Sequence, residues 1–343
     1  MTMRKITLFL LLMFSLAVQA RRHTDITVLQ WNVWQEGTSV KGGYEAIVDE
    51  IVRLKPDFVM LSEVRNYNNR PFCRRLESSL AEKGLTYYSF TSYDTGLLSL
   101  HPIEDSTVVL GWKASEDAGS VHRLTATVRG KRVAVYTAHL DYRHCAYYDV
   151  RGYDGSTWER REPVTDVEEV LRLNTAGRRD EGIAAFLKQA ARDEAEGRTV
   201  LLGGDFNEPS HLDWTEATRH LYDHQGMVVP WTCSRMLYEA GYTDAWREVW
   251  PDELRHPGIT YPSTNPDVAV DRLTWAPLSD ERERIDFIYY KGKARPLEAR
   301  VFGPDSSIAY GKNLPDPGLD AYILPRGVWP TDHKGVWVKF RLY

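Results

Sequence analysis

The stretch VLLGGDFNEP at residues 200–209 joins a short apolar run to a cluster of polar residues. Val200 to Leu202 has the length and composition of a buried strand, and Asp205 and Asn207 follow it closely. In an open α/β sheet, ligand-binding groups collect just past the ends of such strands. Taken alone, the segment could equally be a turn followed by a helix cap. Its meaning depends on whether other strands in the chain end in the same way.

Other strand-like segments also carry polar residues at or beside their ends. They are Asn32 after Ile26–Trp31, Glu63 after Phe58–Leu61, His139 after the run that ends at Ala138, Asp286 within Ile285–Tyr290, and Asp332 with His333 before Val336–Leu342. Each residue has an ordinary structural explanation by itself. Together they supply carboxylates, carboxamides and two histidines, a set that suits a divalent cation and phosphoester hydrolysis.

Short apolar runs alternate with helical patterns along the chain, which favours an α/β fold. We expect helices at Tyr44–Leu54, Pro71–Lys83 and about Ala176–Glu196, and a hairpin formed by Leu124–Val128 and Arg132–Ala138. Two long segments, at about 141–175 and 211–280, show weak periodicity. Loops of this length in a compact enzyme are usually functional, and the first of the two is the expected place for specificity.

The first of these segments mixes aromatic and arginine side chains, beginning with Tyr142 and Arg143. Such a mixture suits a phosphate-bearing substrate with a flat or apolar part, and a solvated, self-packed loop would explain it equally well. Arg123, on the strand before the hairpin turn, is a further candidate phosphate contact. A solvated strand arginine is the simpler interpretation of that residue.

The composition is that of an ordinary globular protein, with 343 residues of which 43% are hydrophobic and 27% charged. Length alone would suggest about two domains. The formal charge of −5 excludes a polybasic protein held on nucleic acid by charge excess alone, although a local basic groove stays open. The 11 tryptophans and 19 tyrosines are mostly expected in the core.

The first 20 residues have the pattern of a cleaved secretory signal peptide. Arg4 and Lys5 precede a short apolar run, and Ala20 provides the small residue at the cleavage point. The run is too short to span a bilayer comfortably, and we expect no transmembrane segment elsewhere. The sequence therefore predicts a periplasmic or extracellular protein whose mature chain begins near Arg21.

Six motifs together resemble the endonuclease/exonuclease/phosphatase superfamily, which has the DNase I-like fold. They are LQWNVW (29–34), MLSEV (60–64), AHLD (138–141), GGDFNEP (203–209), RIDFIYY (284–290) and TDHKGV (331–336), in the family's order and approximate spacing. The resemblance implies one domain over residues 21–343. It also implies a four-layer α-β-β-α sandwich, in which two facing mixed β-sheets are flanked by helices.

The resemblance also implies roles for individual residues. Asn32, Glu63 and Asp332 would hold Mg²⁺, or Mn²⁺ or Ca²⁺ in its place; Asp205 and Asn207 would position the attacking water and the phosphate; Asp286 would orient His333 as general base or phosphate-contacting cation; and His139 would stabilise charge on the phosphate or assist the leaving group. No motif identifies the carboxylate that supports His139.

These features predict a secreted, metal-dependent phosphoester hydrolase, expected to be a monomer and a phosphodiesterase. The insert with Tyr142 and Arg143 favours a small phosphodiester or lipid head group as substrate. A secreted endonuclease acting on DNA or RNA is the alternative, because acidic nucleases can bind through a metal and a local patch. A catalytically inactive ligand-binding protein on the same fold is the rival from another class.

Overall fold

The computed structural model describes residues 23–111 and 119–343, and two large mixed β-sheets dominate them. Sheet A has the strand order β14 (Tyr322–Ile323), β11 (Ala294–Phe302), β15 (Gly335–Leu342), β1 (Thr24–Asn32), β2 (Phe58–Val64), β4 (Asp94–Ser99) and β3 (Tyr88–Ser89). Sheet B has the order β5 (Asp105–Leu110), β6 (Gly119–Val128), β7 (Lys131–Leu140), β8 (Thr199–Asp205), β10 (Asp286–Lys291) and β9 (Thr243–Asp244). A separate hairpin joins β12 (Ser306–Ala309) to β13 (Lys312–Pro315).

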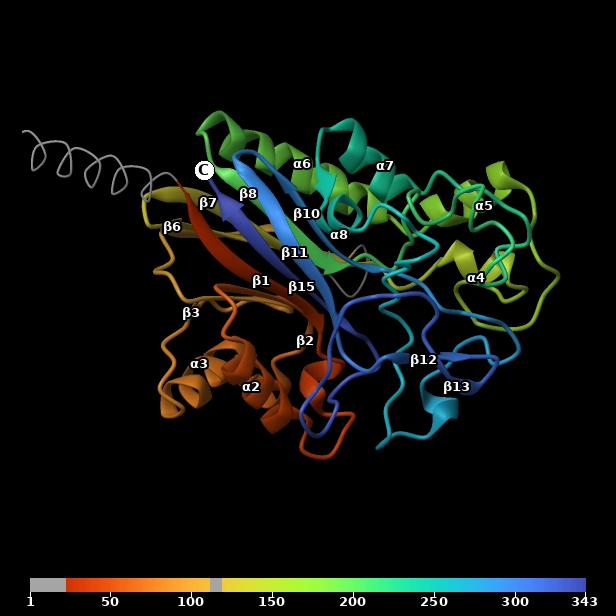
Figure 1. Cartoon of the computed structure of the whole chain (residues 1–343), viewed down its shortest axis with the longest axis horizontal. Coiled ribbons are helices and arrows are strands. Elements are labelled where there is room, and N and C mark those ends of the chain that lie inside the picture. Colours follow the sequence, from red (N-terminus) through yellow and green to blue (C-terminus); the bar gives the residue numbers. More distant parts are fainter. Residues whose placement is uncertain (1–22, 112–118) are drawn as a thin grey trace, which may run out of the picture.

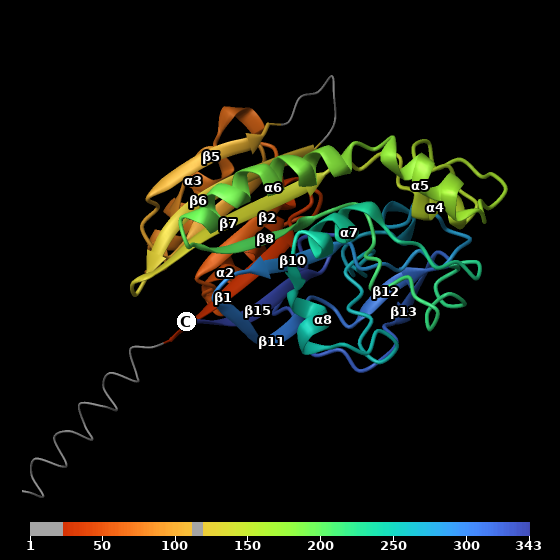
Figure 2. The same ribbon diagram turned by 90° about the horizontal axis from the view of Figure 1, so that it is seen from above.

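The two sheets pack face to face, and helices cover their outer faces (Figures 1 and 2). The helices α2 (Gly43–Leu54) and α3 (Phe72–Glu82) pack on sheet A, whereas α6 (Arg179–Ala195) and α7 (Thr232–Glu239) pack on sheet B. Between the sheets, a buried apolar cluster joins residues such as Val28 and Met60 of sheet A to Val135 and Leu201 of sheet B. This arrangement confirms the predicted α-β-β-α sandwich.

The predicted helices and strands appear close to their expected positions. The three expected helices correspond to α2, α3 and α6, and the expected hairpin corresponds to β6 and β7. The sequence analysis did not identify β4, β5 or β11. Strand β5 lies at a sheet edge, its residues are exposed or half-buried, and its first half, Asp105–Thr107, is polar, so it lacks the pattern of a buried strand.

Gly203 and Gly204 lie inside strand β8, so the alternative interpretation of this stretch as a turn is wrong. A Cβ atom on Gly204 would lie 2.1 Å from the carbonyl oxygen of Ala138 on the neighbouring strand. A Cβ atom on Gly203 would lie 2.2 Å from the sulfur of Met60 in the opposite sheet. The two glycines therefore allow β8 to approach both β7 and sheet A closely.

The strand register brings three candidate residues into one row across sheet B. His139 on β7 pairs with Asp205 on β8, which pairs with Asp286 on β10. In sheet A, Asn32 at the end of β1 pairs with Ser62 of β2. Because side chains at paired positions project from the same face of a sheet, each set points in a common direction.

The two long segments are partly helical, and they pack on each other. The first contains α4 (Ala146–Val150) and α5 (Val167–Thr175), and the second contains α7, α8 (Ala245–Val249) and a short 3₁₀ turn (Val270–Arg272). A buried cluster joins Tyr147 and Tyr148 of the first to Trp214 and Trp231 of the second. In both views α4, α5 and the β12–β13 hairpin lie beyond the same end of the sheets (Figures 1 and 2).

Three further observations concern membranes, thiols and the N-terminal segment. Within residues 23–111 and 119–343, no helix combines the length and apolar character that a bilayer span requires. Cys73, Cys145 and Cys233 are buried free thiols. The predicted signal peptide, residues 1–20, lies outside the described residues.

Candidate active site

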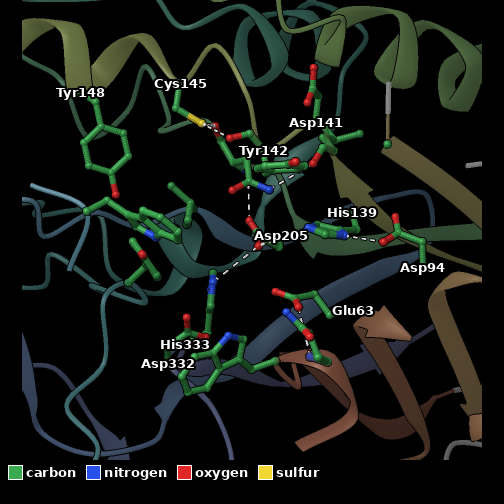
Figure 3. A pocket seen from close by; sticks show the side chains of 18 of the residues that line it. Glu63, Asp94, His139, Asp141, Tyr142, Cys145, Tyr148, Asp205, Asp332 and His333 are labelled. Atoms are coloured by element: carbon green, nitrogen blue, oxygen red, sulfur yellow. Dashed lines mark hydrogen bonds and ion pairs between the residues drawn. The ribbon is translucent and has the colours of Figure 1, made fainter. Parts of the chain in front are cut away.

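A cavity of about 470 Å³ lies where the ends of the two sheets meet the long segments. Its polar lining includes Glu63, Arg65, Asp94, His139, Asp141, Asp205, Asn207, Asp332 and His333. Its aromatic lining consists of Trp34, Tyr93, Tyr142, Tyr147, Tyr148, Trp158, Tyr261 and Trp275. Figure 3 shows Asp205 near the centre of the view, with His139 and His333 on different sides of it. Most of the predicted catalytic and metal-binding residues therefore share one cavity.

His333 is held by a carboxylate behind its ring. Its Nδ1 lies 2.9 Å from Oδ2 of Asp286, whose Oδ1 accepts a 2.8 Å hydrogen bond from Gln30. Burial opposes the charged ring, but the carboxylates of Asp286 and Asp205 outweigh it and raise the pKa of His333 to about 10. His333 is therefore a cation at neutral pH, which favours the phosphate-contacting role over that of general base. Its Nε2 lies 3.7 Å from Oδ2 of Asp205.

His139 is held in the same way by Asp94. Its Nδ1 lies 2.9 Å from Oδ1 of Asp94, which also pairs with Arg65 and accepts a 2.8 Å hydrogen bond from Ser120 at Oδ2. Burial disfavours the charged forms of both His139 and Asp94, but the attraction between the two side chains outweighs this effect. The pKa of His139 rises to about 9, and that of Asp94 falls to about 2. Nε2 of His139 lies 3.9 Å from Oδ2 of Asp205.

Asp205 is the buried acid on which both histidines converge. Its Oδ2 accepts a 2.9 Å hydrogen bond from the side chain of Asn32, and its Oδ1 accepts one of 2.9 Å from the backbone of Asn207. Burial raises the pKa of Asp205, and the two histidine charges only partly oppose this. A carboxylate with a raised pKa is a better proton acceptor than an ordinary surface carboxylate.

Glu63 projects into the cavity from a β-bulge. The pairing between β2 and β4 shifts between Ser62 and Val64, and Glu63 has the left-handed φ of 66°. Its carboxylate accepts hydrogen bonds from the Asn32 side chain, at 3.1 Å, and from the Gln35 backbone, at 3.0 Å. A non-glycine residue in this conformation is uncommon and is often found at functional sites. The bulge interrupts the alternation of side chains along β2 and directs the Glu63 carboxylate toward the cavity.

The donor groups fit a divalent cation near Glu63 and Asp332. Burial raises the pKa of Asp332 to about 7; the charge of His333 opposes this rise and that of Glu63 adds to it. Two carboxylates that disfavour each other's charge are a favourable setting for a hard cation. The side-chain amide of Asn32 donates hydrogen bonds to Glu63 and Asp205. Its Oδ1 accepts a hydrogen bond from the Trp34 backbone at 2.9 Å, and the second lone pair of this oxygen is left for the cation.

A second group of ligand atoms, from Asp205, Asp286 and His333, lies within 4.8 Å. In this group Nδ1 of His333 contacts Asp286, so Nε2 is the ring nitrogen left for a cation. The predicted set of Asn32, Glu63 and Asp332 offers oxygen ligands alone, which are the ligands that Mg²⁺ prefers.

The three candidate substrate contacts have different locations. Tyr142 lines the cavity, and Arg143 is not among the lining residues. Arg123 is buried away from the cavity, where its guanidinium binds Asp193 and Asp105. Its predicted role as a phosphate contact is therefore replaced by that of an internal ion pair.

Asp94 and Arg65 were missed by the sequence analysis. Asp94 stands at the beginning of β4, a strand that the sequence did not predict. Because β4 is antiparallel to β2, its first residue lies beside Val64 at the last position of β2. The sequence signal for this residue was the position of an acid, Asp94, just before the apolar run Gly96–Leu98.

Known proteins resemble this chain over most of its length. An uncharacterized protein of Caenorhabditis elegans, F14F9.5, is 25% identical over 319 residues, which cover 92% of this chain and 91% of that protein. The structure of D. rerio TDP2 with a single-strand DNA product covers 92% of this chain and 99% of that one, with 15% identity and a TM-score of 0.53. C. elegans TDP2 has the same identity and TM-score, and the match covers 92% of this chain and 75% of that one.

At this level of identity, the solved structures support the fold alone. The sequence itself carries the assignment further, because residues 29–333 match the Endonuclease/Exonuclease/phosphatase family. That range includes every predicted catalytic and metal-binding residue from Asn32 to His333. The members of this family are phosphoesterases and nucleases. This chain belongs to the Endonuclease/Exonuclease/phosphatase family.

Proposed function

We propose that this protein is a divalent-metal-dependent phosphodiesterase in which an activated water attacks the phosphorus in line. One observation carries the proposal: His139 and His333, each fixed by its own buried carboxylate, converge on Asp205 within a single cavity. This arrangement supplies a proton acceptor between two cations. A phosphoester has the matching pattern, an electrophilic centre surrounded by anionic oxygens.

In the proposed reaction, the Asp205 carboxylate accepts a proton from the attacking water. Its raised pKa suits this step, and Asn207 holds its Oδ1 in position. His139 and His333 donate their Nε2 hydrogens to phosphate oxygens or to the departing oxygen. Because both are charged at neutral pH, they stabilise the negative charge that develops in the transition state. No residue becomes covalently attached.

Glu63 and Asp332, with Asn32, would hold the cation. A bound Mg²⁺ or similar ion would neutralise charge on the phosphate and the leaving oxygen. Such an ion needs only one or two carboxylates and keeps its remaining positions for water and substrate oxygens. The two carboxylates of Glu63 and Asp332 meet that requirement.

The proposed substrate is a small phosphodiester. Among the described residues that line the cavity, the cationic side chains are Arg65, His139 and His333, and Arg65 is already paired with Asp94. A long nucleic acid needs several cations to neutralise successive phosphates. A nuclease activity stays the alternative, because the solved D. rerio TDP2 has a single-strand DNA product.

The proposal is tested by assaying the purified protein with Mg²⁺, with and without EDTA, on a chromogenic phosphodiester, plasmid DNA and sphingomyelin. We expect hydrolysis of the chromogenic ester that EDTA and the variants Glu63→Ala and His333→Ala abolish. Activity that survives all three changes would overturn the mechanism. Plasmid nicking faster than cleavage of either small substrate would favour the nuclease, and ligand binding without any turnover would favour the inactive binding protein.

We also propose that the chain is exported and cleaved after Ala20, on the basis of the N-terminal sequence alone. The test is expression of the full-length chain, followed by cell fractionation and N-terminal sequencing of the product. Recovery outside the cytoplasm with Arg21 as the first residue is expected. An intact N-terminus in the cytoplasmic fraction would contradict export.

A further inference from the structure

We propose that Tyr142, Trp158 and Trp275 form an aromatic platform that binds the flat ring of a nucleoside joined to the scissile phosphate. This inference rests on the proposed function and names its substrate class. All three side chains line the same cavity as His139, Asp205 and His333 (Figure 3 labels Tyr142). A substrate phosphate between the histidines and a ring on the platform would therefore occupy one continuous space.

The rings of the platform form a layered array. Those of Tyr142 and Trp158 are nearly parallel, with an angle of 4° and centroids 6.4 Å apart. The rings of Trp158 and Trp275 meet at 33°, with centroids 4.6 Å apart. Tyr142 is 47% exposed and Trp275 is 51% exposed. The outer members of the array thus leave much of their apolar surface uncovered, at the edge of a cavity that can receive a ligand.

Two segments far apart in sequence build the platform. Tyr142 and Trp158 belong to the first long segment, and Trp275 belongs to the second. Hydrogen bonds join the segments: Arg151 donates to the Asp280 carbonyl at 2.7 Å, and the Leu278 backbone donates to the Tyr153 hydroxyl at 3.1 Å. The buried cluster that includes Tyr148 and Trp214 lies beneath them. The platform is therefore supported by a small core of its own.

The backbone at Trp158 supports a positional role for this side chain. Trp158 has a left-handed φ of 58°, which is an outlier for a bulky residue. A turn closed by Asp154 fixes the segment, since the Asp154 side chain accepts from the backbones of Ser156 and Thr157 at 2.9 Å. The backbone of Trp158 then donates to the Asp154 carbonyl at 2.8 Å. The loop thus holds the indole between the two outer rings of the platform.

The ring geometry distinguishes among ligands. A quaternary ammonium group, as in choline, is bound by aromatic faces that converge on a point from several directions. The rings of Tyr142 and Trp158 are instead nearly parallel, and that of Trp275 is inclined by 33° to Trp158, so the platform presents its faces in layers, which suits offset stacking with another flat ring. Bases stack on aromatic side chains whatever their sequence, because every base has a π-face. A nucleoside is therefore favoured over a choline head group.

The decisive measurement is calorimetric binding of four probes to the purified protein with Mg²⁺. The probes are adenosine 5′-monophosphate, methyl phosphate, phosphocholine and adenosine. The variants Tyr142→Leu and Trp275→Leu replace a ring by an apolar side chain at half-exposed positions, where folding should be unaffected. Tyr142→Phe and Trp275→Phe keep a ring, and Tyr343→Leu is a matched control at a tyrosine that is 48% exposed and outside the cavity lining.

We expect the wild-type protein to bind adenosine monophosphate more tightly than methyl phosphate or phosphocholine. Each leucine variant should weaken binding of adenosine monophosphate about 5- to 150-fold, the range for loss of one stacked base. Methyl phosphate should bind the same variants as it binds wild type, and the phenylalanine variants and Tyr343→Leu should retain most of the affinity. The platform would be overturned if wild type bound phosphocholine more tightly than adenosine monophosphate. It would also be overturned if the leucine variants lost as much affinity for methyl phosphate as for adenosine monophosphate.

The fourth probe separates this proposal from the proposed function. If the protein hydrolyses no phosphoester but binds adenosine, and the leucine variants lose that binding, the platform stands and the hydrolase proposal fails. If the protein hydrolyses phosphodiesters but the leucine variants bind adenosine monophosphate as wild type does, the platform alone is wrong.

Discussion

Nδ1 of His139 lies 2.9 Å from Oδ1 of Asp94, and the two residues come from opposite sheets. His139 is the penultimate residue of β7 in sheet B, and Asp94 begins β4 of sheet A. His333 and Asp286 repeat the relationship in reverse, since His333 lies just before β15 of sheet A and Asp286 begins β10 of sheet B. Each histidine is therefore oriented by the sheet that does not carry it. Both histidine–carboxylate pairs of the site therefore depend on the packing of one sheet against the other.

The first prediction concerns the charge of Asp94. The change Asp94→Asn keeps the size of the side chain and removes the charge that raises the pKa of His139 to about 9. His139 should then be neutral over much of the range above neutral pH. We expect kcat/KM near pH 8 to fall by about 10²- to 10⁴-fold, the usual contribution of a positioned acid or base. The alkaline limb of the pH profile should move to lower pH, which a merely structural role would not produce.

The second prediction concerns stability and pH. The raised pKa of His139, from 6.5 to about 9, gives a stabilising contribution that is complete below pH 6.5 and lost as pH rises through about 9. The lowered pKa of Asp94, from 3.8 to about 2, gives one that is complete above pH 3.8 and lost as pH falls toward 2. Urea unfolding of wild type and Asp94→Asn should therefore differ most between pH 4 and 6.5. A difference that does not vary with pH would contradict this coupling.

The catalytic residues that could be predicted from the sequence share a local signal. Asn32, Asp205 and His139 each follow an apolar run directly, so periodicity alone places them at strand ends. Asp94 lacks that signal, because it precedes an apolar run and its position depends on the pairing of β4 with β2. Arg65 directly follows β2, but its contact with Asp94 depends on the same pairing. Pairing is a long-range property that a period of two residues does not encode.

The aromatic platform illustrates a second limit. The composition of the first long segment indicated a specificity loop, and Tyr142 indeed lines the cavity. Trp275 could not be connected to it from the sequence, because more than a hundred residues separate the two and neither lies in a periodic segment. Short helices such as α4 were missed for the same reason, since five residues are too few to show a helical period.

The third prediction concerns metal binding. Titration of the purified protein with MgCl₂ should raise its thermal midpoint, because a ligand that binds only the folded state at 100 times its Kd adds about 2.7 kcal/mol of stability. Glu63→Gln should remove most of this shift. Glu216→Gln, a change at an exposed acid, is the control and should keep it. The measurement needs no substrate, and an equal shift in both variants would place the cation elsewhere.

The fourth prediction concerns the glycine pair of the GGDFN segment. In Gly204→Ala the new Cβ would lie 2.1 Å from a backbone oxygen of β7, so β7 and β8 must separate. We expect a loss of about 3 kcal/mol in the free energy of unfolding, the upper part of the usual range for overpacking. Gly111→Ala is the control, because its nearest neighbour would be a side-chain carbon at 3.4 Å. Equal stability of the two variants in chemical denaturation would show that the strands can adjust.

The fifth prediction tests the reassignment of Arg123. The variant Arg123→Met leaves the buried Asp193 carboxylate without its 2.8 Å partner at Nε, although Arg198 remains 3.6 Å away. Removal of one member of a buried ion pair costs about 3 to 5 kcal/mol, and Arg198 should keep the loss near the lower value. Because Arg123 does not line the cavity, kcat/KM of the folded variant should match that of wild type. A variant with normal unfolding but a large loss of kcat/KM would restore Arg123 as a substrate contact.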